Sequence, residues 1–250
     1  MSAHGPPRAN LGAGVNRPWD AFLRAQPAEF LRRVPGREAF VWNSESGAPL
    51  IVKRTCEAVA LGLRSPGAIE YENLRSLGRD GIPVPRALGW SARREGPFGL
   101  ARRSLVAMER VEHAQTLRER LARAAPAERQ ALGRRLLALV VRLHEAGWYH
   151  RDLYLQHFVL RGEELVLLDV GRARHGRRVR ARWFEKDLAA LLHSTPRTVP
   201  VRERLRFLAR YLEARGIGQR RRWLRAIVRR ERRMAAHAPR HGEAQPWEDR

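Results

Sequence analysis

Two short segments, separated by a turn-like stretch, constrain this chain most strongly. Residues His150–Phe158 read His-Arg-Asp-Leu-Tyr-Leu-Gln-His-Phe, and residues Leu167–Gly171 read Leu-Leu-Asp-Val-Gly. Each segment sets an aspartate beside an apolar run typical of a β-strand. The polar stretch Arg161–Glu164 between them is typical of a turn. The pattern therefore predicts two short strands joined by a turn, with Asp152 before the first strand and Asp169 after the second.

Two carboxylates in this layout match the chemical needs of phosphoryl transfer. One orients and deprotonates the acceptor hydroxyl, and the other holds the magnesium that bridges the nucleotide phosphates. The order is typical of a kinase catalytic loop followed by a metal-binding Asp-x-Gly. We therefore predict Asp152 as the base or acceptor-orienting group, with Arg151 and His157 as further catalytic candidates. Asp169 is the predicted Mg²⁺ ligand; the alternative is that both aspartates are ordinary turn residues.

A lysine about a hundred residues upstream of Asp152 is the third candidate group. Lys53 ends the apolar run Pro49–Val52, which is the position of the kinase strand lysine that holds the nucleotide phosphates. Its partner should be a carboxylate on the next helix, for which Glu70 fits best and Glu72 is the second choice. The alternative is a solvated lysine at a strand end.

Lysine is scarce in this chain, because the 49 basic residues include only two lysines, Lys53 and Lys186. A genome that favours arginine codons explains most of this bias. Arginine is a wide planar fork, whereas lysine is a compact point charge. A lysine that persists in such a background is therefore a candidate for a narrow site where arginine would not substitute.

The composition excludes several classes of protein. With 44% hydrophobic and 30% charged residues, the chain is expected to be globular and soluble. No run of eighteen apolar residues exists, so no membrane span is predicted. The single cysteine, Cys56, excludes an internal disulfide and favours a reducing compartment, so we expect the cytoplasm. A formal charge of +23 predicts an anionic partner: nucleic acid, an acidic membrane surface or a phosphorylated substrate.

Local patterns predict an α+β, bilobal fold with a small antiparallel sheet and one helix in the N-lobe and a mainly helical C-lobe. We predict a disordered leader over 1–17, an N-lobe over 18–108, a hinge over 109–114, a C-lobe over 115–236 and a flexible tail over 237–250. The hinge makes Glu109 and Val111 further nucleotide-binding candidates.

The expected elements follow from periodicity and from breaker residues. Strands are predicted over 39–42, 50–53, 87–90 and 104–108, with an Arg- and Gly-rich loop between the last two. Helices are predicted over 18–33 (one or two short ones), 65–79, 127–146, from 186 onward, 201–214 and 220–234. Gly147 is expected to end the helix over 127–146.

His157 distinguishes this chain from ordinary kinases, which carry asparagine five residues after the catalytic aspartate. Magnesium prefers oxygen ligands, so either one metal is used chiefly or His157 acts through a hydrogen bond; a core histidine is the alternative. With the Arg-Trp-Phe-Glu-Lys-Asp-Leu-Ala-Ala-Leu run over 182–191, the loop resembles the lipopolysaccharide kinase family. That family comprises core heptose(I) kinases and 3-deoxy-D-manno-octulosonic acid (Kdo) kinases, and the resemblance covers roughly residues 38–195.

The resemblance implies a protein-kinase-like fold, ATP and Mg²⁺ as cofactors, and a sugar hydroxyl of the lipid A–core as acceptor. It implies Asp152 as the catalytic residue, Asp169 as the metal ligand, and Lys53 with Glu70 as the nucleotide pair. We also predict His157 as a second residue of the metal site. The acceptor glycolipid carries phosphates and carboxylates, with which guanidinium groups pair in bidentate fashion. We therefore predict acceptor binding by Arg172, Arg174, Arg178, Arg180 and Arg182, against the alternative of a solvated basic loop.

Basic residues also crowd the two predicted C-terminal helices, between Arg202 and Arg233. Such a surface predicts peripheral contact with the anionic cytoplasmic face of the inner membrane. Other functions stay open: a kinase of a protein or small metabolite, or a nucleotide-binding pseudokinase scaffold. A nucleic-acid-binding protein is not favoured, because no binding motif or stacking platform is present. The sequence does not indicate whether the protein is a monomer or an oligomer.

Overall fold

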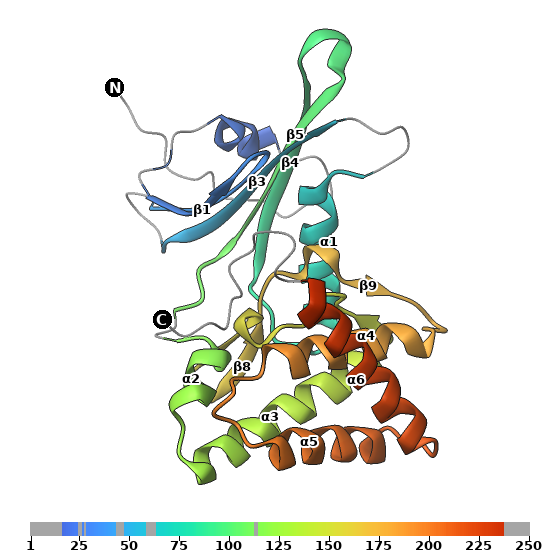
Figure 1. The fold of residues 1–250 in the computed structure, drawn as a ribbon. Coiled ribbons are helices and arrows are strands. Elements are labelled where there is room, and N and C mark those ends of the chain that lie inside the picture. The colour runs from blue at the N-terminus through green and yellow to red at the C-terminus, as the bar shows by residue number, and fades with distance from the viewer. Residues whose placement is uncertain are drawn as a thin grey trace. The chain divides into compact units, whose positions relative to one another are not determined.

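The computed structural model describes residues 17–24, 27, 29–43, 48–58, 64–112 and 115–237. The chain divides into two compact units, Met1–Glu112 (unit 1) and His113–Arg250 (unit 2), and each is described by itself. Figure 1 shows unit 1 as a twisted sheet with a long helix and unit 2 as a mainly helical body. The predicted leader and tail lie outside the described residues, apart from Arg17 and His237, as do hinge residues 113 and 114.

Unit 1 is built on one five-stranded antiparallel sheet, with the strand order β1-β2-β3-β5-β4. Its strands are β1 (Glu29–Val34), β2 (Arg37–Trp42), β3 (Leu50–Ala58), β4 (Ala87–Glu95) and β5 (Ala101–Glu109). The other elements among the described residues of this unit are two 3₁₀ helices, η1 (Arg17–Leu23) and η2 (Pro97–Gly99), and the helix α1 (Pro66–Arg79). Trp19, Phe22 and Leu23 of η1 pack on the sheet with Phe40, Val52, Leu105 and Ala107, and this cluster forms a core.

The helix α1 begins and ends where the sequence predicts. Ser65 caps its N-terminus by accepting a hydrogen bond from the backbone N–H of Ala68, and Pro66 occupies a first-turn position without losing a bond. A Cβ on Gly67 would lie 2.2 Å from the carbonyl oxygen of Leu105. Glycine at this position therefore lets α1 pack directly on β5, and this contact places Glu70 one turn further along.

The prediction of helices over 18–33 is wrong for its second half, because Glu29–Val34 is a strand. The Pro35–Gly36 turn, with Gly36 at φ +73°, folds this segment back onto β2. Phe30 then packs against Phe40 with ring centroids 6.1 Å apart. Pairing with a neighbouring strand thus overrides the local helical pattern.

The strands β3, β4 and β5 are longer than predicted. The expected Arg- and Gly-rich loop is mostly paired strand, since Ser91 to Glu95 face Ala101 to Leu105 in register. Their many arginines hid the strand pattern, although Ser91 and Ser104 are fully buried. A consequence is that Lys53 lies in the middle of β3, between Val52 and Arg54, instead of at its end.

In the residues of unit 2 that the structure describes, there are five α-helices, four short strands and two 3₁₀ helices. The helices are α2 (Leu117–Arg123), α3 (Pro126–Glu145), α4 (Ala181–Ser194), α5 (Val201–Ala214) and α6 (Arg220–His237). The short elements are β6 (Trp148–Tyr149), η3 (Leu155–His157), β7 (Phe158–Arg161), β8 (Glu164–Leu167), η4 (Val170–Arg172) and β9 (Arg174–His175). β7 pairs with β8, and β6 pairs with β9, both antiparallel.

Most predictions for unit 2 agree with the structure. The hairpin β7–β8 turns at Arg161–Glu164, and α5 has the predicted bounds. α3 ends just before Gly147, whose φ of +79° suits glycine. α4 begins at Ala181, five residues before the predicted start, because the Arg-dense stretch contributes its first turn. Among the described residues, no helix is both long and apolar enough to cross a membrane.

Candidate active site

The loop that carries Asp152 is fixed by a buried carboxylate from another helix. Asp187 of α4 accepts hydrogen bonds from the backbone N–H of His150 at 2.6 Å and of Arg151 at 2.7 Å. Arg151 has φ +76°, a conformation that a long side chain rarely adopts. The two bonds to Asp187 hold this strained backbone in place. Ser194 adds a third anchor, because its Oγ accepts the N–H of Leu155 at 2.9 Å.

Asp187 itself is tied to a buried polar chain that sequence reasoning missed. His144 of α3 has its Nε2 3.4 Å from Asp187 Oδ2, and its Nδ1 lies 2.7 Å from the hydroxyl of Tyr211 on α5. Burial lowers the pKa of His144 and raises that of Tyr211. The imidazole is then neutral. Its Nε2–H points toward Asp187, and its Nδ1 accepts a hydrogen bond from the hydroxyl of Tyr211. The sequence signal for this contact was weak: Asp187 directly precedes the apolar run Leu188–Leu192 within α4.

Asp152 lies between two cations. Arg172 Nη1 is 2.7 Å from Asp152 Oδ2, and Lys186 Nζ is 3.8 Å from Asp152 Oδ1. The side chain of Asp152 is 20% exposed, so solvent still reaches the carboxylate. Lys186 is half-buried, and this burial lowers its pKa despite the nearby Asp152. The second of the two lysines in the chain is thus beside the predicted catalytic aspartate.

His157 connects the two motifs. Its Nδ1 lies 2.9 Å from the backbone carbonyl of Asp152, which can only accept, so Nδ1 carries the proton of that bond. Its Nε2 lies 3.8 Å from Asp169 Oδ2. The backbone carbonyl of His157 accepts the N–H of Leu168 at 2.7 Å, which joins the loop to the segment before Asp169. Asp169 has φ +55° and a side chain that is 54% exposed.

In unit 1, Lys53 and Glu70 form an ion pair. Lys53 Nζ lies 2.7 Å from Glu70 Oε1, with side chains 24% and 10% exposed. Glu72, the second choice, is instead paired with Arg64 and points to the exposed side of α1. Glu109 is the last residue of β5, and its N–H donates to the carbonyl of Arg86. Val111, two residues further, has a buried side chain.

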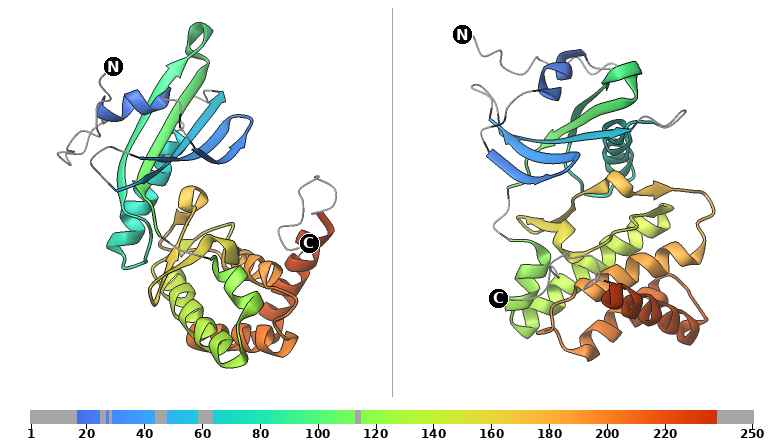
Figure 2. Two further views of the ribbon diagram at one scale, coloured as in Figure 1. Left: turned by 90° about the vertical axis from the view of Figure 1, so that its left-hand side faces the viewer. Right: turned by 45° about the horizontal axis from the view of Figure 1, so that its top comes forward.

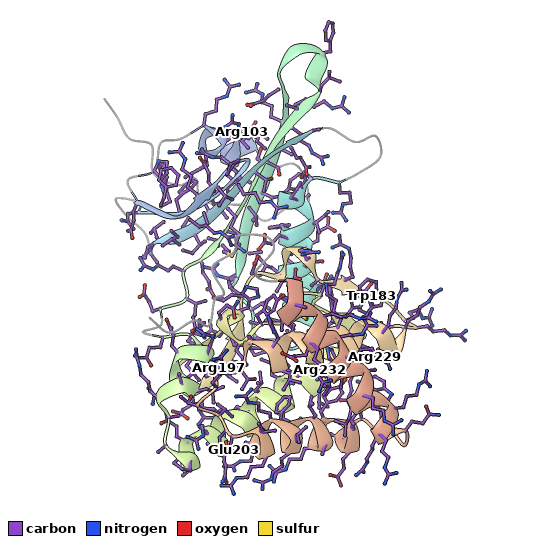
Figure 3. The ribbon with its side chains drawn as sticks, viewed as in Figure 1. Arg103, Trp183, Arg197, Glu203, Arg229 and Arg232 are labelled. Atoms are coloured by element: carbon purple, nitrogen blue, oxygen red, sulfur yellow. The ribbon has the colours of Figure 1, made fainter. Side chains whose placement is uncertain are left out.

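The arginines predicted to bind the acceptor differ in their contacts. Arg172 contacts Asp152, and Arg174 donates to the carbonyl of Ala173. Arg182 lies over the ring of Trp183, as does Arg151 from the loop that carries Asp152. Arg178 and Arg180, together with Arg174, are exposed. Figure 3 shows Trp183 on the side of unit 2 where basic side chains extend outward.

The comparisons with known proteins agree with one another. The family model of the lipopolysaccharide kinase (Kdo/WaaP) family matches residues 57–211. The lipopolysaccharide core heptose(I) kinase WaaP of Pseudomonas aeruginosa is 29% identical over 203 residues, which cover 76% of this chain and 70% of that protein. WaaP of Escherichia coli is 30% identical over 70% of this chain and 71% of its own length.

Two further relatives extend this picture. The 3-deoxy-D-manno-octulosonic acid kinase of Stenotrophomonas maltophilia is 33% identical over 134 residues, which cover 52% of this chain and 50% of that protein. A solved structure of WaaP in complex with acyl carrier protein has a TM-score of 0.66 and 25% identity, covering 87% of this chain and 92% of that one.

The fold and the two aspartate motifs define a protein-kinase-like phosphotransferase, which confirms the predicted fold class. The chain belongs to the lipopolysaccharide kinase (Kdo/WaaP) family. It is therefore a kinase whose acceptor is a sugar hydroxyl of the lipopolysaccharide core, as the resemblance implied.

Proposed function

We propose that this kinase transfers the γ-phosphoryl group of ATP to a heptose or Kdo hydroxyl of the lipopolysaccharide inner core. The observation that supports the proposal most strongly is the position of Asp152, on a loop held by Asp187 and between the side chains of Arg172 and Lys186. Phosphoryl transfer relies on positioning and on charge stabilisation, and this arrangement offers both. A protein or small-metabolite acceptor has no comparable support.

Asp152 is assigned to the acceptor hydroxyl, whose proton it receives as the oxygen attacks phosphorus. Lys186 is assigned to the transferred group, because an ammonium 3.8 Å from Asp152 lies where negative charge collects during transfer. Arg172 is placed to exchange its contact with Asp152 for an anionic group of the nucleotide or acceptor. A small, rotatable ammonium group suits this role better than a guanidinium, which accounts for lysine at position 186.

The residues around Asp169 fit a magnesium ion that is held mainly by the nucleotide. Asp169 offers an exposed carboxylate, and Mg²⁺ commonly takes one or two carboxylates plus phosphate oxygens and water. Within the ranges that the structure covers, no group of three or more His, Cys, Asp or Glu side chains gathers to form a full protein cage. When bound, Mg²⁺ neutralises phosphate charge. His157 is assigned to positioning Asp152 through its carbonyl bond.

We assign nucleotide binding to Lys53, oriented by Glu70, and to the backbone at Glu109 and Val111, which follows the end of β5. The exposed Arg174, Arg178 and Arg180 are assigned to the phosphates and carboxylates of the acceptor, whereas Arg182 stacks on Trp183. The lipid-linked acceptor and the basic α5 and α6 support contact with the anionic, cytoplasmic face of the inner membrane. Most arginines of these helices are exposed; Arg204 instead donates to backbone carbonyls and Arg230 pairs with Glu185.

The test is phosphate transfer from labelled ATP to a dephosphorylated, delipidated inner core by the purified protein with Mg²⁺. We expect transfer by the wild type and a loss of about a thousandfold or more in Asp152→Asn. Asp80→Asn, an exposed change at the end of α1, is the matched control and should retain activity. ATP binding without transfer to heptose- or Kdo-containing cores would contradict the assigned acceptor, and equal activity of both variants would contradict the role of Asp152.

A further inference from the structure

The turn of the β4–β5 hairpin exposes two large apolar side chains. Phe98 is 95% exposed and Leu100 is 66% exposed, the highest values for large hydrophobic residues in the part of the chain that the structure describes. The last register pairs of the hairpin are Glu95 with Ala101 and Ala101 with Ala58, so the turn extends past the paired sheet. Figures 1 and 2 show this turn pointing outward from unit 1. An apolar end of this kind is unfavourable in water unless something covers it.

The backbone of the turn adds to this cost. Phe98 adopts φ +57° and ψ +15°, the left-handed region that a bulky aromatic residue rarely occupies. Its neighbours Gly96 and Gly99 also have positive φ, at +77° and +64°, and they adopt it without strain. Glycine or asparagine would suit position 98 better than phenylalanine does. Strain that is kept at an exposed position indicates that the side chain has a function there.

Directly behind the apolar end, the hairpin carries a collar of four arginines. In the β4–β5 register Arg93 faces Arg103 and Arg94 faces Arg102, so like charges are opposed across the strands. Glu95 accepts from Arg103, and the resulting hydrogen bond lowers the pKa of Glu95, while Glu57 pairs with Arg102. Arg93 and Arg94 are exposed, and no carboxylate among the described residues lies within ion-pair distance of either one.

We propose that this hairpin docks on an anionic phospholipid bilayer, with Phe98 and Leu100 inserted at the headgroup–acyl boundary and the exposed Arg93 and Arg94 of the collar on the lipid phosphates. Apolar side chains beside basic residues are the composition that binds membrane interfaces. A second copy of this chain is disfavoured as the partner, since its own collar would repel. A protein socket is disfavoured because a specific interface needs about 800 Å² from each partner, far more than a five-residue turn presents.

The proposal gives the lipid-linked acceptor of the proposed function a route to the enzyme, but its test needs no turnover. We would measure co-sedimentation with vesicles of phosphatidylcholine containing phosphatidylglycerol, at low salt. Phe98→Gly should weaken binding about tenfold without lowering the melting temperature, because glycine relieves the positive φ. Arg93→Ala and Arg94→Ala should each weaken it about fivefold. Leu31→Ser, a change at an exposed apolar site of β1, is the matched control and should bind as the wild type does.

Insertion itself can be followed with a fluorophore. In a Cys56→Ser background, which leaves no other cysteine, Leu100→Cys labelled with an environment-sensitive dye should show a blue-shifted emission on vesicle addition. The same label at Leu31→Cys should not shift.

Three results would overturn the proposal: no vesicle binding by the wild type, full binding by Phe98→Gly, or loss of binding only in Arg202→Ala/Arg206→Ala of α5. The last would assign the membrane to the C-terminal helices. Phosphate transfer to the delipidated core should be unchanged in Phe98→Gly. Vesicle binding therefore tests the membrane proposal, and phosphate transfer tests the proposed kinase function independently.

Discussion

The carboxylate of Asp187 on α4 accepts a 2.6 Å hydrogen bond from the backbone N–H of His150, although the two residues are 37 positions apart. This bond fixes the entry to the loop that presents Asp152. Because Asp187 is fully buried and accepts two backbone N–H groups, the loop that carries Asp152 depends on a side chain that need not touch a substrate.

Replacing this anchor should therefore reduce stability and turnover together. In Asp187→Asn the amide would face two backbone donors with one acceptor, which leaves a buried donor unsatisfied. We expect a loss of about 1–3 kcal/mol in the free energy of unfolding, measured by urea denaturation. The kcat of the folded fraction should fall at least about tenfold. Glu185→Gln, on the same helix, should change kcat little; a normal kcat in Asp187→Asn would show that the loop holds its shape without this bond.

Lysine at position 186 should not be replaceable by arginine. In Lys186→Arg the positive charge is kept, yet the wider guanidinium cannot occupy the same place beside Asp152, so kcat should fall by about a hundredfold with the KM for ATP nearly unchanged. Because burial lowers the pKa of Lys186 below its ordinary 10.5, wild-type kcat should decline at alkaline pH below that value. The arginine variant should lack this decline, and a variant with wild-type kcat would remove Lys186 from the transfer step.

The Lys53–Glu70 ion pair should contribute to the use of ATP and not only to the stability of the fold. Glu70→Gln removes the negative charge that lies 2.7 Å from Lys53 Nζ, and we expect kcat/KM for ATP to drop roughly tenfold to a hundredfold. Glu72→Gln is the matched control on the same helix, since Glu72 pairs with Arg64 instead. Steady-state kinetics with ATP varied at saturating acceptor separates the two. Equal effects of both changes would count against the assignment.

Acid should destabilise the protein through its buried histidines. Burial lowers the pKa of His144 and of His150 below the ordinary value of 6.5. Below pH 6.5 the unfolded chain binds protons that the folded chain excludes, so the free energy of unfolding should fall as pH drops. Melting temperature should be nearly flat above pH 7 and decrease between pH 6.5 and 5. His144→Gln should show a shallower decrease there; an unchanged slope would mean that His144 does not carry the effect.

The exposed arginines before α4 should select the acceptor. Replacing Arg178 and Arg180 by alanine removes two guanidinium groups that could pair with phosphates or carboxylates of the core. We expect the KM for the inner core to rise about tenfold or more and the KM for ATP to stay constant. Arg222→Ala/Arg225→Ala on α6 is the control for general loss of charge. Equal changes in both KM values would indicate a general effect of charge and not an acceptor site.

Sequence alone determined the features that depend on neighbours in the chain. The cap at Ser65, the stop at Gly147 and the turn over Arg161–Glu164 are local signals, so the helices and the hairpin that they bound were predictable. The motifs around Asp152 and Asp169 indicated phosphoryl transfer because spacing within a loop and hairpin is itself local. The same locality made Glu70 a better partner for Lys53 than Glu72, because the two stand on opposite sides of one helix.

Only the tertiary structure decided which distant residues meet. It made Glu29–Val34 a strand, because pairing with β2 outweighs a helical pattern. It placed Arg172, which had been predicted to bind the acceptor, against the carboxylate of Asp152. It also brought Lys186 to the same carboxylate. It also buried Asp187 between His144 and the loop that carries Asp152. No periodicity encodes such contacts, since they arise where helices and loops far apart in the chain pack together and bury charges that must then find partners.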